Sequence, residues 1–339
     1  MSADELVSIV IPAYNAQATL DETLRSVRGQ THRVLEIIVV DDGSTDTTRA
    51  LAERHAAADA RVHVLHQANA GVAAARNAGW SHARGQFIAF VDADDLWAPT
   101  KIERQLAALL QGGPEVGLAY CWTARLDEQG IVTRCYGGTR HEGEVLTTIL
   151  RSNFVGSGSN VMVRRQAFID AEGFDIRLRA GGGEGCEDWL FSCRVAENHR
   201  FVSVPEYLVG YRWLHSSMSN NRSGMLRSHM LMCRHMIARR PEHTDAALNG
   251  LQSYCAWLLR DAIGQRSPRQ AWSLWRLMWS EHRHVAWRVL WRDLLLDPVR
   301  FARDRLPRLL PHRRRRHSGI TAAPSPMIVG QRFLEPPPS

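Results

Sequence analysis

Phe90-Val91-Asp92-Ala93-Asp94-Asp95 is an apolar run that leads directly into three closely spaced carboxylates. Unpaired carboxylates are costly to bury, so we expect them to face a ligand or a divalent cation. Two other apolar runs, residues 7–11 and 36–40, also end in polar residues, Pro12-Ala13-Tyr14-Asn15 and Asp41-Asp42-Gly43-Ser44. In open α/β sheets, ligands bind at the carboxyl edge of the strands. The sequence therefore predicts a ligand site along that edge.

Strand-like and helix-like segments alternate through the first 110 residues. Predicted strands cover residues 7–11, 36–40, 62–65 and 87–91, and predicted helices cover residues 19–27, 45–57, 72–83 and 101–110. This βαβ repetition predicts an α/β fold whose central sheet is mostly parallel and is flanked by helices. Farther along, strands are predicted at residues 117–122, 131–135, 202–204 and 207–211. A Gly/Ser-rich loop is predicted to enter another strand over residues 156–163. Helices are predicted from about residue 164 to 172 and from 187 to 197.

Charge and composition differ between residues 1–223 and residues 224–339. Its 339 residues are 45% hydrophobic and 23% charged, an ordinary balance for a globular protein with a large core. The net charge of +7 is uneven, because residues 1–223 carry 22 Lys and Arg against 27 Asp and Glu, whereas residues 224–339 carry 20 against 8. We therefore expect a sheet domain at residues 1–223, a helical Arg- and Trp-rich extension at 224–310, and a basic, Pro-rich tail at 311–339 that is disordered.

Six of the eleven tryptophans fall between Trp257 and Trp291 in the extension, accompanied by arginines. Trp and Arg on the same helices suit peripheral association with an anionic membrane. Equally, the tryptophans can pack against the sheet domain or a second subunit, and the sequence leaves these alternatives open, together with the oligomeric state. The basic run at residues 313–316 comes with no nucleic-acid reader fold, so no nucleic-acid partner is expected.

The chain starts without a basic leader, and no apolar run approaches the ~20 residues needed to span a bilayer. The expected location is therefore the cytoplasm, with the inner face of the cell membrane as a further option. The six cysteines contain no CxxC pair, so we expect reduced thiols and no zinc site.

Four motifs now occur in order: residues 7–15, residues 39–46, Asn69-Ala70-Gly71 with Ala75-Arg76-Asn77-Ala78-Gly79, and residues 90–95. Together they resemble family 2 glycosyltransferases over about residues 5–220, and their shared order makes the resemblance specific. It implies a GT-A (Rossmann-like) fold and an inverting transfer of a hexose-type sugar from a nucleotide-diphospho-sugar, with UDP favoured. The implied acceptor is a hydroxyl of a glycan or lipid-linked molecule in cell-surface polysaccharide or glycolipid assembly.

The resemblance identifies Asp92-Ala93-Asp94 as the family's DxD motif. It implies Asp94 as a direct ligand of Mg²⁺ or Mn²⁺, with Asp92 in the same metal site and nearer the sugar or ribose. Such a cation would neutralise the departing diphosphate. The stretch Tyr211-Arg212-Trp213-Leu214-His215-Ser216-Ser217-Met218-Ser219 resembles the family's closing motif. That resemblance implies His215 as a third ligand of the metal, although one extra residue here separates the arginine from the histidine. The alternatives are a helix-capping carboxylate after Pro99 and an ordinary surface histidine.

The other donor-binding residues also come from the resemblance. It implies that Asp42 reads a uracil base, that Pro12, Tyr14 and Asn15 lie against the nucleotide, and that Arg76 contacts phosphate oxygens. The residue types suit these roles, since a tyrosine ring is an apolar platform and a guanidinium binds phosphate with two N–H groups. The alternatives are a simple turn at Asp42, a tyrosine that closes a core edge, and an ion pair between Arg76 and a nearby carboxylate.

Glu187-Asp188 follows a glycine-rich loop and matches the family's ED motif. The match implies Asp188 as the catalytic base and Glu187 as part of the nucleotide-sugar site. An inverting transfer needs one carboxylate to take the acceptor proton, and a helix N-terminus tends to keep such a group ionised. The alternative is that Glu187 and Asp188 only form an acidic first turn of a helix and have no catalytic role. No QxxRW signature of processive synthases is present, which favours single additions.

Other classes of function make different demands on the sequence. A nicotinamide-dependent oxidoreductase needs a GxGxxG turn, and Pro12-Ala13-Tyr14-Asn15 stands in its place. A non-catalytic sugar-nucleotide binder or membrane-peripheral assembly protein on the same fold stays open, but the intact carboxylates argue against a non-catalytic role.

Overall fold

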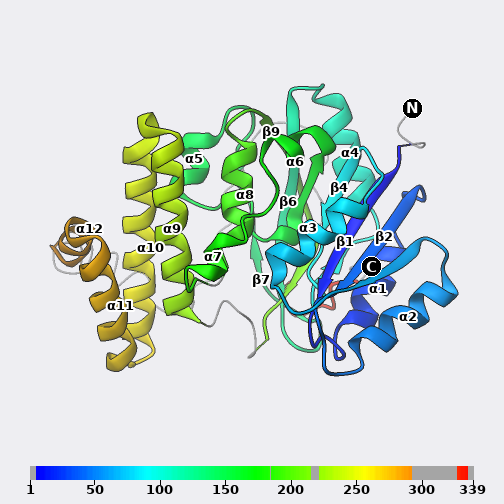
Figure 1. The fold of residues 1–339 in the computed structure, drawn as a ribbon, viewed down its shortest axis with the longest axis horizontal. Helices are drawn as coiled ribbons and strands as arrows, with labels where there is room; N and C mark the ends of the chain where they lie inside the picture. The colour runs from blue at the N-terminus through cyan, green and yellow to red at the C-terminus, as the bar shows by residue number, and fades with distance from the viewer. Residues whose placement is uncertain (1–4, 184, 215–220, 292–326, 335–339) are drawn as a thin grey trace.

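The computed structural model describes residues 5–183, 185–214, 221–291 and 327–334. A nine-stranded sheet in the order β3-β2-β1-β4-β8-β6-β9-β5, with β7 paired to β6, forms its centre (Figure 1). The strands are β1 Val7–Ala13, β2 Leu35–Asp41, β3 Val62–His66, β4 Phe87–Phe90, β5 Leu96–Trp97, β6 Val116–Leu126, β7 Val132–Tyr136, β8 Val161–Arg164 and β9 Arg200–Arg212. The helices of the sheet domain are α1 Leu20–Arg28, α2 Thr48–Ala58, α3 Val72–His82, α4 Lys101–Gln111, α5 Leu146–Arg151, α6 Arg165–Asp170, α7 Arg177–Ala180 and α8 Glu187–Val195, with a 3₁₀ turn at Gly158–Asn160.

The sheet has a parallel half and a mixed half. Strand β1 pairs in parallel with β2 and β4, and β2 pairs in parallel with β3. Beyond β4, strand β8 is antiparallel to both its neighbours, so β6 again runs in the direction of β4, and β9 is parallel to β6. The predicted α/β class with a helix-flanked sheet is confirmed, and the parallel pairing that the βαβ alternation indicates is concentrated in its first half.

Both faces of the first strands are covered, which explains their continuous apolar runs. Successive residues of β1 alternate between two cores, since Ile9 and Ile11 belong to the core under α1, α2 and α4, whereas Val10 belongs to the core on the other face. That second core also takes in Phe90 of β4 and Phe191 of α8. The strand ends are thus held from both sides.

The predicted helical extension is present and consists of α9 Arg222–Arg239, the 3₁₀ turn Pro241–His243, α10 Thr244–Gly264, α11 Pro268–Glu281 and α12 Arg283–Arg288. Its apolar side chains belong to the same continuous core as one face of the sheet. Leu274 and Met278 of α11 point into that core, whereas Trp272, Trp287 and Trp291 are exposed. Among the described helices, none is both long and apolar enough to cross a membrane.

The chain's last described residues depart from the predicted disorder of residues 311–339. The Gln331 carbonyl accepts a hydrogen bond from the Val132 N–H at 2.9 Å, and the Gly330 N–H donates to the Val132 carbonyl at 2.8 Å. Phe333 is buried against Leu96 and Leu126. The buried Phe333 side chain and hydrogen bonds to the edge of β7 therefore hold residues 327–334 in place. The average composition of the tail does not predict these contacts. The basic run at 313–316 lies outside the described residues.

Candidate active site

Parallel strands bring the predicted motifs to one edge of the sheet. β1, β2 and β4 end there, so Tyr14, Asp42 and Asp92 follow three neighbouring strands in the order predicted. Helices α3 and α8 add Arg76 and Glu187 from the sheet face that they cover. The edge therefore gathers residues that are far apart in the chain.

Arg76 joins two of these motifs directly. Its Nη2 donates to an oxygen of Asp92 at 2.6 Å, and its Nη1 donates to an oxygen of Glu187 at 2.7 Å. The side chain is almost fully buried, and its Nε has no partner among the described residues. Burial lowers the pKa of Arg76, but the charges of Asp92, Glu187 and Asp188 outweigh burial, and the net pKa is raised. Arg76 is therefore a permanent cation inside an acidic cluster.

Asp188 lies in the first turn of α8. Gly185 and Cys186 precede it with φ of 71° and 63°, a left-handed turn that starts the helix abruptly. One oxygen of Asp188 accepts from the Trp189 N–H at 2.7 Å, and no other described residue donates to the second oxygen. Burial, aided by Glu187 and opposed by Arg76, raises the pKa of Asp188 to about 7. Burial therefore opposes the tendency of a helix N-terminus to keep this group ionised. A carboxylate that titrates near neutral pH suits a general base.

Asp94 and Asp95 have different surroundings despite their adjacency. Asp95 is fully buried and accepts hydrogen bonds from Ser159 Oγ at 2.6 Å and from the Arg212 N–H at 3.0 Å. No other described residue donates a hydrogen bond to the Asp94 carboxylate. Burial and then the neighbouring charge of Asp92 raise the pKa of Asp94 to about 7. Asp95 therefore anchors the turn, and Asp94 has oxygens available to a ligand.

Asp92 and Asp94 fit a hard divalent cation, because they supply carboxylate oxygens that repel each other without one. No cluster of three His, Cys, Asp or Glu side chains arranged for a metal occurs in the described part of the chain. The protein would thus contribute two carboxylates, and diphosphate and water oxygens would complete the shell, as is common for Mg²⁺. His215, the third predicted ligand, lies outside the described residues.

Asp42 holds the loop that leads into α3. Its carboxylate accepts from Gln67 Nε2 at 2.7 Å, from the Ala70 N–H at 2.9 Å and from the Gly71 N–H at 2.8 Å. This structural role was not predicted. A carboxylate has about four acceptor positions, so one remains for a ligand.

The end of β1 presents the other predicted base-binding residues. Pro12 is buried in the strand opposite Val40, whereas the Tyr14 side chain is 53% exposed. Asn15 adopts φ of 47° and accepts from the Thr45 N–H at 2.9 Å, which ties the loops after β1 and β2 together. The Tyr14 ring is therefore an exposed aromatic surface beside a fixed loop.

Comparison with known proteins places the chain in a family. Residues 8–171 match the family described as Glycosyl transferase family 2. The chain is 32% identical over 225 residues to the "Putative teichuronic acid biosynthesis glycosyltransferase TuaG" of Bacillus subtilis (strain 168), which covers 64% of this chain and 82% of that protein. The chain belongs to glycosyl transferase family 2. The predicted family is thereby confirmed.

Solved structures show the fold of this family 2 glycosyltransferase. TarS 1-349 from S. aureus in complex with UDP-GlcNAc superposes with a TM-score of 0.60 at 17% identity, covering 82% of each chain. The mannosyltransferase PcManGT from Pyrobaculum calidifontis, in complex with GDP-Man and Mn²⁺, superposes with a TM-score of 0.53 at 18% identity, covering 86% of this chain and 80% of that one. The predicted GT-A fold is confirmed.

Two residues of this glycosyltransferase that support the site were missed from sequence. Ser159 Oγ accepts from the Asp92 N–H at 3.0 Å and donates to Asp95, so it braces both ends of the acidic turn. Arg212 donates from Nε to the Asp94 carbonyl at 3.0 Å and pairs with Glu22 at 2.6 Å. Arg212 lies in a stretch that resembles the family's closing motif, but Ser159 lies in a Gly/Ser-rich loop that carries no comparable signal.

Proposed function

We propose that this family 2 glycosyltransferase transfers a sugar from a nucleotide-diphospho-sugar to a hydroxyl acceptor, with inversion and with Mg²⁺ or Mn²⁺ as cofactor. The observation that carries the proposal is the Arg76 bridge between Asp92 and Glu187, with Asp188 beside it. It unites the acidic turn after β4 and the start of α8 in one ionic cluster. UDP is the favoured nucleotide, since the TarS structure holds UDP-GlcNAc.

In this proposal Asp188 takes the proton of the acceptor hydroxyl as that oxygen attacks the anomeric carbon. The bond from that carbon to the phosphate oxygen breaks at the same time, and the nucleoside diphosphate leaves. One displacement without a covalent intermediate inverts the anomeric centre. A cation held by Asp92 and Asp94 would stabilise the negative charge of the leaving diphosphate. Arg76 holds Asp92 and Glu187 in place through Nη2 and Nη1, and its buried Nε has no partner among the described residues.

The nucleotide would lie along the ends of β1 and β2. Pro12 and Asn15 shape the loop, the exposed Tyr14 ring offers a stacking surface, and the remaining acceptor position of Asp42 can receive a base imide N–H. Burial of the aspartate in a rigid loop makes such a contact selective, because a mismatched base would leave it unpaired.

The setting we propose is cell-surface polysaccharide or glycolipid assembly with a glycan or lipid-linked acceptor, which the name of TuaG supports. The enzyme would work in the cytoplasm at the inner face of the membrane. In support of this, Trp275 and Trp279 of α11, Trp287 of α12 and the following Trp291 form a continuous series of ring contacts. Trp287 and Trp291 are exposed, as are Arg283 and Arg288, whereas Trp275 and Trp279 are half-buried. Exposed Trp with Arg is typical of surfaces that meet anionic lipid.

The test is a panel of UDP- and GDP-sugars with Mn²⁺ or Mg²⁺, scored for nucleoside diphosphate release by purified protein. Asp188→Asn should reduce release by on the order of 10³-fold while UDP affinity is kept, because only the base is lost. Asp245→Asn, the same change at an exposed site on α10, is the matched control. Near wild-type turnover in Asp188→Asn would refute the assigned base. Tight UDP-sugar binding with no release for any sugar would favour the non-catalytic alternative.

A further inference from the structure

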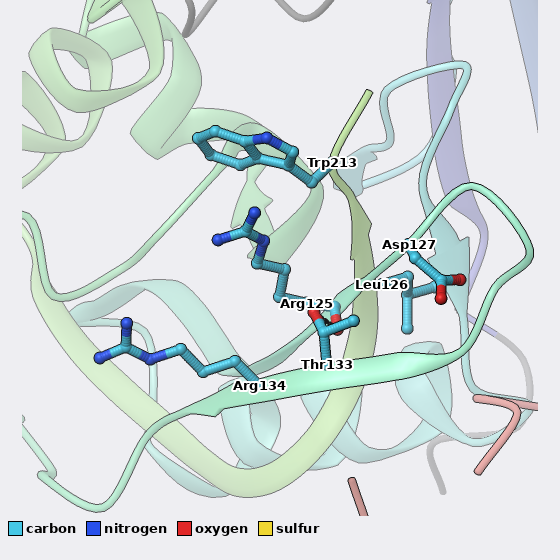
Figure 2. Close-up of a pocket in the computed structure, with 6 residues that line it drawn as sticks. All are labelled: Arg125, Leu126, Asp127, Thr133, Arg134 and Trp213. Atoms are coloured by element: carbon cyan, nitrogen blue, oxygen red, sulfur yellow. Dashed lines mark hydrogen bonds between the residues drawn. The ribbon is translucent and has the colours of Figure 1, made fainter. Parts of the chain in front are cut away.

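A pocket of about 290 Å³ lies between β6, β7 and the end of β9, apart from the acidic cluster. It is lined by Arg125, Leu126, Asp127, Thr133, Arg134 and Trp213. Figure 2 shows the side chains of Arg125, Arg134 and Trp213 at one end of the pocket, with Asp127 directed away from them. Two guanidinium groups and one indole ring in a single pocket suit a negatively charged ligand.

Arg125 and Arg134 are like charges on two paired strands, β6 and β7. In the β6–β7 register Arg125 is directly opposite Arg134, so their side chains leave the same face of the sheet. Like charges at directly opposed positions destabilise a strand pair. Neither arginine forms an ion pair within the described part of the chain, and the Arg125 Nε is buried without a partner there. An anion between them would offset the repulsion.

The described residues that line the pocket do not supply that anion. One oxygen of Asp127, Oδ1, accepts from the Gln129 and Ile131 N–H groups at 3.0 and 2.9 Å, and Figure 2 shows this side chain directed away from the two arginines. The Arg125 guanidinium instead lies 4.0 Å from the centroid of the Trp213 ring. The ring fixes the guanidinium in one plane and leaves its N–H edge for a ligand.

The pocket lies toward the same edge of the sheet as the proposed active site. Strand β6 runs in the same direction as β4, so both end at the same edge of the sheet. The Trp213 N–H donates to the Leu126 carbonyl at 3.0 Å, and the preceding residue, Arg212, donates to the Asp94 carbonyl. Trp213 is therefore one residue along the chain from a contact with the turn that we assign to the donor diphosphate.

We infer that this pocket binds the phosphate group of a phosphorylated glycan acceptor, an inference that rests on the proposed function. Guanidinium groups bind phosphate oxygens with paired N–H donors, and the indole face offers a surface for a sugar ring. The two positive charges of Arg125 and Arg134 match the charge of a diphosphate or of successive phosphodiesters better than the single charge of a uronate. The donor's own diphosphate has the Asp92–Asp94 side of the site, which leaves this pocket to the acceptor.

The test measures transfer by the full chain with Mn²⁺ and whichever donor the nucleotide-sugar panel identifies, using four acceptors. They are an alkyl-diphosphate-linked N-acetylglucosamine, a glycerol phosphate oligomer, a phosphate-free alkyl N-acetylglucosaminide and an alkyl glucuronide. We expect one of the two phosphorylated acceptors to have the lowest KM, and which one it is tells a lipid-linked diphosphate from a polymer phosphodiester. A lower KM for the glucuronide, or equal values for all four, would overturn the assignment.

Substitutions of the two arginines test whether they contact the acceptor phosphate. Arg125→Gln and Arg134→Gln should each raise the KM for the phosphorylated acceptor by about 10-fold or more, because a charge-assisted hydrogen bond is lost. Donor hydrolysis, UDP affinity and the KM for the phosphate-free acceptor should stay unchanged. Arg54→Gln, on the exposed side of α2, is the matched control. Calorimetric titration of the alkyl diphosphate sugar without donor gives a readout independent of turnover.

Three results would contradict the inference in distinguishable ways. A fall in UDP affinity in Arg125→Gln would assign the pocket to the donor. A lower melting temperature with unchanged KM would assign the arginines to structure, whereas relief of their repulsion predicts an equal or higher melting temperature. If no nucleotide sugar were hydrolysed even by the wild-type protein, the proposed function would fail and this inference with it.

Discussion

Arg76 connects carboxylates that belong to different elements of the sheet domain. Its planar fork donates from Nη2 to Asp92 and from Nη1 to Glu187, which a lysine ammonium could not do with the same geometry. Removal of one member of a buried ion pair leaves an uncompensated charge and typically costs about 3–5 kcal/mol. Arg76 is therefore a positioning residue for both carboxylates, and any substitution there would disturb the whole cluster.

The pKa of Asp188 leads to a pH prediction. Because burial raises that pKa to about 7, the ionised base becomes more abundant as the pH rises through 7. We expect kcat/KM to increase over this interval and then level off. Glu187→Gln removes a negative charge that raises the pKa of Asp188, so the rise should move to lower pH by about one unit. The measurement is kcat/KM between pH 5 and pH 9 for both proteins.

Glu242→Gln, a matched change at an exposed position, should leave that profile where it is. Loss of Glu187 also frees Arg76 to act more strongly on Asp188, and this effect has the same sign. A shift of the rise to higher pH in Glu187→Gln would therefore contradict both the base and its surroundings.

Individual site residues differ in how far the sequence predicts them. Asp92 and Asp188 stand in recognisable motifs, and the structure brings those motifs together. Their link through Arg76 was only one of two alternatives, because an ion pair between residues 111 positions apart leaves no local pattern. The same holds for the three hydrogen bonds to Asp42, whose donors lie 25 to 29 residues away.

The turn between β4 and β5 combines a fixed part with a free part. Asp95 is tied to Ser159 and Arg212, which fixes the backbone of the turn. Asp92 and Asp94 extend from that fixed backbone. A rigid support for two repelling carboxylates is suited to bind a cation, since the cation need not order the loop on binding.

We therefore expect Mn²⁺ to raise the melting temperature of the wild-type protein. A cation that binds only the folded state stabilises it by about 2.7 kcal/mol at 100 times its Kd. Asp94→Asn should lose most of this stabilisation, while Asp245→Asn keeps it. Thermal unfolding followed with increasing Mn²⁺ measures both, and an equal response in wild type and Asp94→Asn would contradict the metal site.

The pH dependence of folding stability gives a second test of Asp94 in the same turn. The pKa of Asp94 is raised to about 7 in the folded protein from an ordinary value near 4. The folded state thus binds more protons between these values, and metal-free wild type should lose stability as the pH rises from about 4 to 7. Asp94→Asn should lose less over that interval, since this titrating group is absent.

Elements were predicted well and their ends less well, for physical reasons. The helix predicted from residue 45 begins at Thr48, because the residues before it are held by another segment. Thr45 and Thr47 donate to the side chains of Asn15 and Gln17, and Asp46 accepts from the Thr48 N–H at 2.9 Å. Likewise, the strands predicted at 202–204 and 207–211 are one strand, β9, whose register with β6 shifts around Trp122.

The helical extension is part of the same core as the sheet domain. Trp189 of α8 donates from Nε1 to the Ile149 carbonyl at 2.8 Å, and its ring lies 4.4 Å from that of His229 on α9. The helix that carries Asp188 is therefore held between α5 and α9. Change of composition at about residue 224 predicts where the extension begins. It does not predict this shared packing, because the partners of an amphipathic helix cannot be read from its own pattern.

Gly250 controls how closely α10 approaches α5, and a substitution there tests this packing. A Cβ at Gly250 would lie 2.1 Å from the Leu150 carbonyl oxygen, so Gly250→Ala must push the two helices apart. Overpacking of this kind costs about 1–3 kcal/mol, whereas Gly264→Ala on the same helix meets nothing within 4 Å and should be neutral or slightly stabilising. Urea unfolding compares the two variants, and donor turnover should fall in Gly250→Ala alone because α8 loses its support. Equal stability of both variants would show that the extension does not press on the sheet domain in solution.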